Sequence, residues 1–509
     1  MTKPKDSAEN GARGGVAAIK ARRSMILAER SKGGSPAAVH PVTGGVVVHP
    51  LMDEEAELVA DEEAVLVTDV LAQVRAFERG DHAEVAGLLF KAFEGRAGVS
   101  LVNDRGELWC YSRNEGLWRL ISEEEVTRLV ALLAGTSIRS SEGEATKCFK
   151  GSSTNASGVW KFLRSAPKGE HGPGFFDQAP EGVAVANGFL VIEDGAVTAR
   201  PHDWRHRVRD RIPIAYDPKA DAPRWTRSLA EWFEADPDAG EKIAFLGEFV
   251  GACLFGLATR YQRCAVLLGE GANGKSVFIE VVSELFHKGG VTAIGPHDFS
   301  DERMGAGLDR SRLNAVTEIA DRAILASEGF KAAVSGDPMT RRRAYGTEFT
   351  FKPRAGHLFS ANKLPPVADT TNGFWRRLVL VSFNRRFEGA GRDPTLRAAL
   401  MRELPGVLAW AAEGAARLVT TGRYTEPASS KTALADWRRE SNPVELWLDE
   451  RCERTGWTDA MTLFQSYQGW AQNNGFKSMS IREWGSRMKA LVEWKKSDRN
   501  KYAVQVRVQ

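Results

Sequence analysis

A glycine-rich segment between an apolar strand and an amphipathic helix constrains this chain more than any other feature. The segment is GEGANGKS, residues 269–276, which satisfies the pattern G-x-x-x-x-G-K-[ST]. CAVLL precedes it directly, and VFIEVVSELF follows it with the periodicity of a helix. In such a loop, backbone N–H groups close around the β-phosphate and the helix N-terminus adds a favourable dipole. The sequence therefore predicts a phosphate-binding loop between a strand and a helix.

Six residues of this loop are the predicted nucleotide ligands. We expect Lys275 to reach the β- and γ-phosphate oxygens and the Ser276 hydroxyl to bind Mg²⁺, so ATP and Mg²⁺ are the expected ligands. The alternative is a chance match between an ordinary strand and an ordinary helix, which the flanking pattern disfavours. The full set is Gly269, Gly271, Asn273, Gly274, Lys275 and Ser276.

Three later segments carry polar residues at the ends of short apolar strands. SRLNAVTEIAD contains Glu318, which could bind Mg²⁺ or polarise the attacking water, and GHLFSANKLP contains Asn362, which could orient that water. GFWRRLVLVSF places Arg376 and Arg377 before a third strand, which suggests one structural ion pair and one arginine finger for a neighbouring subunit. Taken singly, each has an ordinary explanation as a strand-end carboxylate, a turn Asn or a surface basic pair. Their order after the phosphate loop favours the catalytic interpretation.

A basic hairpin is predicted between the first two of these segments. SGDP is a turn signal, and TEFTFK alternates like an exposed strand. A basic tip with an aromatic ring on a projecting loop suits contact with the backbone of single-stranded DNA. A solvated basic turn is the alternative. The predicted DNA contacts are Arg341, Arg342, Arg343 and Tyr345.

Composition and periodicity divide the chain into four regions. Residues 1–80 are basic, then acidic, with few aromatic residues, which predicts a disordered tail. Residues 81–225 predict a mixed α/β domain. Residues 226–425 alternate helices with apolar strands, which predicts a largely parallel sheet with helices on both faces. Residues 430–509 contain three amphipathic segments and a strand-like end, as in a winged-helix module.

Two local signals in the second region predict where elements begin or turn. Ser122, followed three residues later by Glu125, is a capping-box arrangement at a helix N-terminus. Asp194 and Gly195 separate two strand-like runs, as in a hairpin turn.

Charge and cysteine usage limit the partners and the location. The formal net charge is only +3 over 509 residues, so contacts with nucleic acid must come from local patches. The five cysteines form no CxxC pair and no cluster with histidine, which argues against a zinc ribbon and fits a reducing cytosol. The longest apolar run, residues 243–258, contains Glu248 and three glycines and predicts a buried helix. We expect a cytoplasmic protein, in a bacterial host, with no membrane partner.

Together these motifs resemble those of the superfamily 3 helicases, specifically the primase-helicase type of poxviruses and satellite phages. The resemblance runs from about Trp109 to Phe383 and so covers over half the chain. The segments that carry it are GANGKS, RLNAVTEI, FKAAVSGDPMTRRRAYGTEFTFKP, LFSANKLP, FWRRLVLVSF and, upstream of these, VANGFLVIEDGAVTARPHDWRHRVRDRIPIAYDPKADAPRW.

The resemblance implies an AAA+-like P-loop NTPase core that assembles as a ring, expected to be a hexamer. Such a ring moves along single-stranded DNA and unwinds the duplex at the replication fork of a phage, plasmid or related mobile element. The residues named above then keep the roles given to them, with the hairpin 335–347 contacting DNA and either arginine of the pair acting as the finger.

Two features depart from that family. Its second motif often carries paired acids, whereas Thr317 precedes Glu318 here, which leaves open how the metal and the water are shared. Relatives often carry a primase domain at the N-terminus, whereas residues 1–80 are of low complexity, so we expect no primase activity. A primase, if needed, would be a separate protein, and that primase or another replisome protein is the possible partner.

Two other functions stay open. A packaging or remodelling ATPase would use the same core without separating strands. Alternatively, the C-terminal region binds an origin while the core only assembles around it. The intact Lys275, Glu318, Asn362 and arginine pair count against this non-catalytic alternative.

Overall fold

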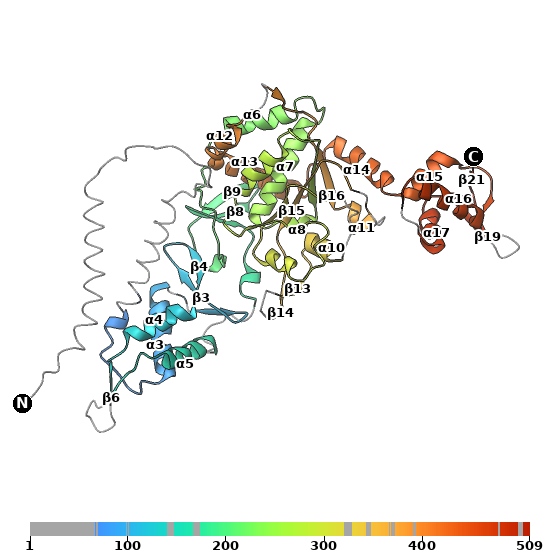
Figure 1. Ribbon diagram of the computed structural model, residues 1–509. Coiled ribbons are helices and arrows are strands. Elements are labelled where there is room, and N and C mark those ends of the chain that lie inside the picture. Colours follow the sequence, from blue (N-terminus) through green and yellow to red (C-terminus); the bar gives the residue numbers. More distant parts are fainter. Residues whose placement is uncertain are drawn as a thin grey trace, which may run out of the picture. The chain divides into compact units, whose positions relative to one another are not determined.

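The computed structural model divides into two compact units (Figure 1). The first lies within Met1–Ala179 and His202–Arg209, and the second within Pro180–Pro201 and Asp210–Gln509. Most of the expected tail, residues 1–80, lies outside the described residues. Those described are 67, 70–97, 99, 101–139, 147–165, 174–319, 328–342, 348–365, 367, 372–389, 393–476, 479–496 and 502–508.

Helices and a small antiparallel meander share the core of the first unit. Leu89, Val130 and Leu163, from three different helices, are buried together. Strands β2, β3 and β4 pair in sequence order, with Trp109 of β3 opposite Leu120 of β4. The elements are β1 (Ala76–Phe77), α3 (His82–Ala97), β2 (Val102–Asp104), β3 (Glu107–Ser112), β4 (Leu117–Leu120), α4 (Glu123–Leu132), β5 (Ser137–Ile138), β6 (Lys147–Cys148), α5 (Ser153–Ser165), η1 (Phe176–Gln178) and η2 (Trp204–His206).

The predicted capping box at the start of α4 is half formed. The Ser122 hydroxyl accepts a hydrogen bond from the backbone N–H of Glu125 at 3.1 Å, as expected. The Glu125 carboxylate does not return to the backbone of Ser122, because it pairs with Arg119 at 2.7 and 2.9 Å. A charged partner on the preceding strand therefore replaces the second bond of the box.

In the described part of the second unit, five parallel strands form one sheet in the order β11–β12–β15–β10–β16. The parallel sheet predicted from the sequence is confirmed: each neighbouring pair runs in the same direction. The strands are β10 (Cys264–Leu268), β11 (Val291–Thr292), β12 (Leu313–Val316), β15 (Gly356–Ala361) and β16 (Leu378–Ser382).

Both faces of this sheet are covered, which explains why its strands are nearly continuous apolar runs. Ala265 and Leu267 of β10 face one core, whereas Cys264 and Val266 face the other. The first core includes residues of α6 (Pro223–Trp232), α7 (Ala239–Phe255), α9 (Lys275–Ser283) and α13 (Leu404–Thr421). The second includes residues of η3 (Met304–Asp309), α10 (Glu328–Ser335), α11 (Asn372–Trp375) and α14 (Ala428–Glu440). Short helices α8 (Ala258–Tyr261) and α12 (Leu396–Met401) complete this part.

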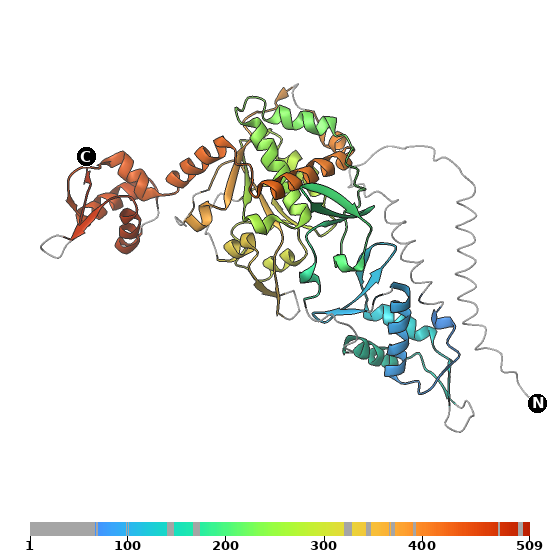
Figure 2. The ribbon, with the colours of Figure 1, turned by 180° about the vertical axis from the view of Figure 1, so that it is seen from behind.

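Helices α7 and α13 lie side by side, as the two opposite views show (Figures 1 and 2). The predicted buried helix over residues 243–258 corresponds to most of α7. The Glu248 side chain is fully buried in it and accepts hydrogen bonds from Arg417 Nε of α13 at 2.8 Å and from the N–H of Thr425 at 2.7 Å. No helix in the described ranges is long and apolar enough to cross a bilayer.

The hairpin predicted within the second region belongs to the second unit. Strands β7 (Val183–Val185), β8 (Gly188–Glu193) and β9 (Ala196–Arg200) form it, and its turn is at Asp194 and Gly195, with φ of 52° and 78°. The domain predicted over residues 81–225 would have included this hairpin in the first unit. Val185 and Leu190 are instead buried in the same core as α7 and α13, which supply the apolar surface that this hairpin needs.

The C-terminal residues form a separate core around Trp447, Tyr467 and Trp484. Three helices and a terminal ribbon are present, as expected, while the winged-helix interpretation stays a prediction. The elements are α15 (Pro443–Arg451), β17 (Cys452–Glu453), β18 (Thr458–Asp459), α16 (Ala460–Asn473), α17 (Ile481–Lys489), β19 (Trp494–Lys496), β20 (Tyr502–Val504) and β21 (Arg507–Val508).

A histidine is fully buried in the second core. His357 of β15 lies among the rings of Phe299, Phe330 and Phe359, at centroid distances of 5.1, 6.4 and 6.3 Å. Burial disfavours the imidazolium and lowers the pKa of His357 to about 4. The folded chain therefore holds this imidazole neutral.

We predict that His357 makes the second unit less stable in acid. The pKa of His357 is lower in the folded than in the unfolded chain. The neutral imidazole therefore makes its full contribution to the stability of the folded chain above about pH 6.5. As the pH falls toward 4, the free energy of unfolding should drop by up to about 3 kcal/mol. In His357→Gln, which cannot titrate, this part of the pH dependence should disappear. Urea unfolding at several pH values gives the free energy of unfolding of both proteins. If this free energy falls in parallel for the wild type and the variant down to about pH 4.5, the prediction is wrong.

Candidate nucleotide site

Three polar segments meet at the carboxyl edge of the parallel sheet. Strands β12, β15 and β10 are adjacent and parallel, and the residues that follow their last positions lie at one edge. The phosphate loop follows β10, Asn362 follows β15, and Glu318 lies two residues beyond β12. The sheet order therefore brings together three segments that are far apart in the sequence.

The loop backbone is shaped by residues with positive φ. Gly271, Ala272 and Gly274 have φ of 87°, 47° and 96°, and α9 begins immediately afterwards at Lys275. A Cβ on Gly274 would lie 2.4 Å from Nε1 of the buried Trp232, so both its φ and this close approach require glycine. At Gly271 a Cβ would meet no atom within 4 Å, so φ alone favours glycine there.

Lys275 is the buried charge of this site. Only 4% of its surface is exposed. Its ammonium donates hydrogen bonds to the Gly269 carbonyl, to Asn273 Oδ1 at 3.1 Å and to Asn362 Oδ1 at 3.4 Å. All three acceptors are neutral, so a buried positive charge here favours binding of an anion. Burial lowers the pKa of Lys275, and the nearby Glu318 carboxylate opposes that shift.

The contacts continue from Lys275 to Glu318. Asn362 Nδ2 donates to Glu318 Oε1 at 3.4 Å, so Lys275, Asn362 and Glu318 form one chain of side chains. Ser276 and Glu318 are both exposed and offer oxygen donors, which are the ligands that Mg²⁺ prefers. The structure thus brings together the predicted residues for phosphate, metal and water.

Asn273 holds the loop rather than pointing outward. Its side chain is 3% exposed, and its Nδ2 donates to the carbonyl of Phe383, beyond the end of β16, at 3.3 Å. A Cβ on Gly269 would lie 2.2 Å from Asn273 Nδ2, so this glycine provides the space. Asn273 was one of the six predicted ligands. Its side chain instead contacts Lys275 and Phe383, and so positions the loop and the lysine.

The arginine pair lies where the strands begin, at the opposite end of the sheet from the phosphate loop. Leu378, the next residue after the pair, is level with Cys264 at the start of β10, whereas the phosphate loop follows the end of β10. The five residues of β10 span roughly 16 Å at about 3.3 Å per residue. Neither Arg376 nor Arg377 therefore reaches the phosphate loop of its own chain.

The two arginines of the pair have different environments. Arg377 is 8% exposed, and its guanidinium donates to the Gly373 carbonyl and to Ser335 Oγ, the latter at 2.6 Å. Burial, with the neighbouring Arg376 charge, lowers the pKa of Arg377. Arg376 is exposed. Arg377 is thus the structural member of the pair, but a carbonyl and a hydroxyl hold it rather than the carboxylate of the expected ion pair.

The hairpin between α10 and β15 is formed by β13 (Met339–Arg342) and β14 (Glu348–Phe351). Arg341 does not project from it: the side chain is half-buried, donates from Nη2 to the Phe299 carbonyl at 3.1 Å and packs where Gly305 leaves space. Arg342, the last residue of β13, is exposed. Arg343 and Tyr345 lie outside the described residues.

Sequence reasoning missed a buried ionic cluster beneath the end of β16. Lys242 of α7 is fully buried, and its ammonium donates to Asp236 Oδ2 at 2.8 Å and to the Ser382 carbonyl at 3.1 Å. Asn384 Nδ2 donates to the other oxygen of Asp236 at 2.8 Å. The one available signal was a lysine beside the apolar run of α7.

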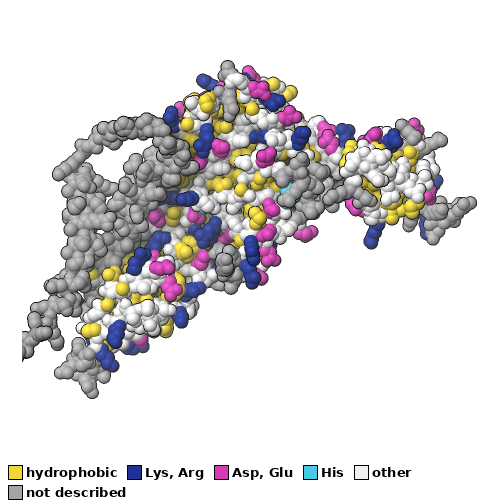
Figure 3. Space-filling model, viewed as in Figure 1, with side chains coloured by type: hydrophobic (Ala, Val, Ile, Leu, Met, Phe, Trp, Pro, Cys, Tyr) yellow, Lys and Arg dark blue, Asp and Glu magenta, His cyan; other side chains and the backbone are white. Residues whose placement is uncertain are grey.

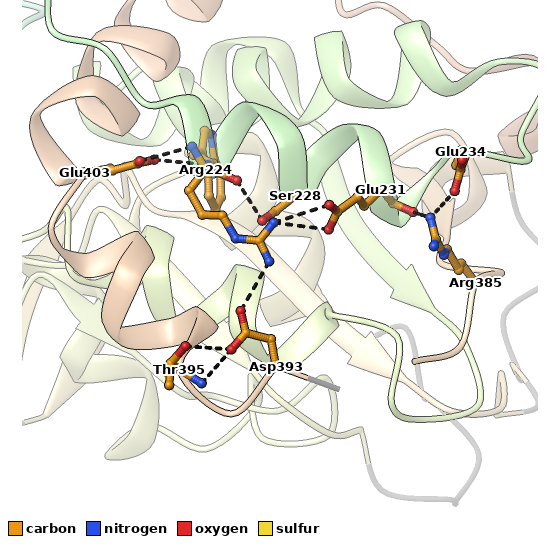
Figure 4. Close-up of polar contacts among 9 residues, drawn as sticks. Arg224, Ser228, Glu231, Glu234, Arg385, Asp393, Thr395 and Glu403 are labelled. Atoms are coloured by element: carbon orange, nitrogen blue, oxygen red, sulfur yellow. Dashed lines mark hydrogen bonds and ion pairs between the residues drawn. The ribbon is translucent and has the colours of Figure 1, made fainter. Parts of the chain in front are cut away.

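A second polar network fixes the start of α6 (Figure 4). The Glu403 carboxylate accepts from the N–H groups of Arg224 and Trp225 at 3.0 and 2.8 Å and so caps this helix from another element. The Arg224 guanidinium reaches Glu231 at 3.3 Å and Asp393 at 3.4 Å. Helix α6, which carries Trp232 under the phosphate loop, is thereby tied to the start of α13.

Two protein families match parts of the chain. Residues 91–234 match the family described as D5 N terminal like. Residues 267–377 match a family described as "Family of unknown function (DUF5906)". The second range contains the phosphate loop, Glu318 and Asn362.

Individual proteins are also similar to this chain. It is 29% identical over 152 residues to "Putative helicase L207/L206" of Acanthamoeba polyphaga mimivirus, and the match covers 27% of this chain and 15% of that protein. The chain thus spans a small part of this curated relative. Among solved structures, it is similar to the A form apo structure of the NrS-1 C terminal region, with 12% identity, a TM-score of 0.46 and coverage of 82% of this chain and 98% of that one. Another apo structure of the same region has a TM-score of 0.40 and 12% identity.

We predict opposite outcomes for the two arginines of the pair. Arg377→Ala removes a buried guanidinium and its charge-assisted bonds to two half-buried partners, and should lower the free energy of unfolding by about 2 kcal/mol. Arg376→Ala removes an exposed side chain and should change it by less than about 0.5 kcal/mol. Urea unfolding of the two variants measures the difference. Equal losses in both would refute the structural role assigned to Arg377.

Proposed function

We propose that this chain is an ATP-dependent DNA helicase that assembles as a ring and acts in the replication of a phage, plasmid or related mobile element. The observation that carries the proposal is the chain of contacts Lys275–Asn362–Glu318 at the end of the phosphate loop. The D5 N terminal like match and the similarity to a protein named a helicase support it. The parallel sheet supports an AAA+-like core.

The residues of the site suit phosphoryl transfer from ATP to water. Lys275 exchanges its neutral acceptors for the β- and γ-phosphate oxygens and neutralises part of their charge. Asn362, released from Lys275, orients the attacking water. Glu318, which lies beside Asn362, accepts a proton from that water. Mg²⁺, held by Ser276 and Glu318, would neutralise further phosphate charge.

Arg376 supports a site that is shared between subunits. It is exposed, and it lies at the edge of the sheet away from the phosphate loop of its own chain. In a closed ring with head-to-tail contacts, one subunit's edge faces the next subunit's nucleotide. We assign the arginine finger to Arg376 rather than Arg377.

The DNA contacts are assigned to local basic surfaces. On the face drawn in Figure 3, Lys and Arg are interspersed with Asp and Glu, in keeping with the small net charge. Arg342 at the end of β13 is one exposed cation of the hairpin. The C-terminal residues 479–508 contain eight Lys and Arg against three Asp and Glu, which suits a module that adds duplex contacts.

We predict that Lys275→Ala reduces ATP hydrolysis to background. The substitution removes the fixed charge that faces the phosphates, while the loop glycines that shape the backbone remain. Circular dichroism should show a folded protein, and steady-state phosphate release should show no ATPase. Near-normal turnover by this variant would remove the basis of the nucleotide site.

Lys275→Ala, combined with Arg376→Ala, tests whether the site is shared between subunits. Arg376→Ala should also be inactive, because a trans arginine is worth about 10³ to 10⁵ in rate. In mixed rings an intact loop can lie beside an intact finger, so mixing the two inactive proteins should restore part of the activity. Fully active Arg376→Ala, or no rescue despite verified co-assembly, would contradict a finger in trans.

We predict that Arg342 contacts a DNA phosphate. Arg342→Ala should weaken binding to single-stranded DNA and lower the slope of log K against log salt by about 0.7. Arg260→Ala is the matched control, because Arg260 is also exposed but pairs with Glu181 and lies outside the hairpin. Anisotropy of a labelled oligonucleotide at several salt concentrations gives both slopes. If the two variants have the same slope as the wild type, the hairpin is a solvated turn.

A further inference from the structure

A segment after β16 runs along the phosphate loop. The N–H of Phe383 donates to the Leu268 carbonyl at 2.7 Å, and the N–H of Phe387 donates to the Ala272 carbonyl at 2.7 Å. The Phe383 carbonyl accepts from Asn273. Residues 383–387 are therefore bound to the loop at both of their ends, and the charges they carry stay close to it.

This segment is also fixed from inside the protein. The buried Lys242 ammonium holds the Ser382 carbonyl, and Asp236 bridges Lys242 to the Asn384 side chain. A buried ion pair with hydrogen bonds on both members keeps one geometry, because breaking it leaves an uncompensated charge. The path of the segment is thus set without any ligand.

The segment carries a second pair of adjacent arginines, whose surroundings differ. Arg385 donates to the Glu231 carbonyl at 3.0 Å, pairs with Glu234 (Figure 4) and lies 4.9 Å from the Phe387 ring centroid. These contacts give Arg385 a structural role at the end of α6.

Arg386 has only exposed carboxylates near its guanidinium in the described structure. Glu270, the second residue of the phosphate loop, lies 4.0 Å from Nη1, and Glu388 lies 3.3 Å from Nε. The three side chains are 53%, 74% and 69% exposed. Exposed ion pairs of this kind contribute little to stability, so exchanging them for another anion costs little.

We propose that Arg386 is a further nucleotide-binding residue, which leaves Glu270 and Glu388 to contact the polyphosphate of a nucleotide bound in the same chain. This inference rests on the proposed function. A nucleoside triphosphate carries several negative charges, whereas the loop itself offers Lys275 and the opposing charge of Glu270. An arginine presents a planar set of donors that matches phosphate oxygens. Arg386 is therefore a cis ligand, distinct from the finger assigned to Arg376.

Binding of ATP with Mg²⁺, measured by calorimetry on the full chain, tests this role. Arg386→Gln should raise the Kd for ATP by about tenfold, as expected for one charge-assisted contact. Glu270→Gln should lower the Kd, because it removes a competing and repelling carboxylate. Arg397→Gln is the matched control: Arg397 pairs with Glu280 at 2.6 Å, is 56% exposed and loses the same charge elsewhere.

The outcomes separate this inference from the function on which it rests. If the wild type binds ATP and Arg386→Gln binds it equally well, Arg386 is not a ligand. Equal weakening by Arg386→Gln and Arg397→Gln would show a general charge effect and would also overturn the role. If neither the wild type nor Arg397→Gln binds ATP, the proposed function fails and this inference fails with it. Thermal unfolding without nucleotide verifies that each variant is folded.

Discussion

The parallel pairing of β10 with both β15 and β16 determines most of what this molecule can do. Parallel strands end at the same edge, so the segments that follow them converge there. The phosphate loop, Asn362 and the segment from Phe383 are brought together in this way. The same geometry sends Arg376 to the far edge. One sheet thus separates the residues proposed to bind a nucleotide in cis from Arg376, the residue proposed to contact a neighbouring subunit.

Buried charges hold both ends of this sheet and its covering helices in place. Lys242 holds the end of β16, Glu248 joins α7 to α13, and Arg377 joins the start of β16 to α10. Each is largely buried and hydrogen-bonded to groups from other elements, so removing those partners would leave a buried charge without hydrogen bonds. Such contacts fix the register of neighbouring elements more strictly than apolar packing does, which suits a site that depends on distances of about 3 Å.

Much of the sheet and of the loop could be predicted from the sequence. The apolar runs gave the strands because both faces are buried, and the glycine pattern gave the loop because backbone φ restricts those positions. The half-formed capping box shows the limit of such reasoning. The hydrogen bond of Ser122 lies within the helix that it caps, so the local sequence predicts it. The Glu125 side chain instead pairs with Arg119 of the preceding strand, which the capping pattern does not predict.

Side-chain roles that depend on distant partners could not be predicted. Three adjacent arginines look equivalent in the sequence, yet Arg341 is held by the Phe299 carbonyl while Arg342 is exposed. The hairpin β8–β9 has an apolar face whose partner, α13, lies some 200 residues later in the chain. The burial of Lys242 could not be predicted, because nothing nearby in the sequence signals that its partner is the Ser382 carbonyl.

Unwinding of a forked DNA substrate tests the central claim most directly. The account predicts that the wild-type chain separates the strands when ATP and Mg²⁺ are present and fails to do so with a non-hydrolysable ATP analogue. Asn362→Ala, which keeps the phosphate loop, should bind ATP but neither hydrolyse it nor separate the strands. Hydrolysis of ATP by the wild type with no strand separation would contradict the account and would favour a packaging or remodelling ATPase.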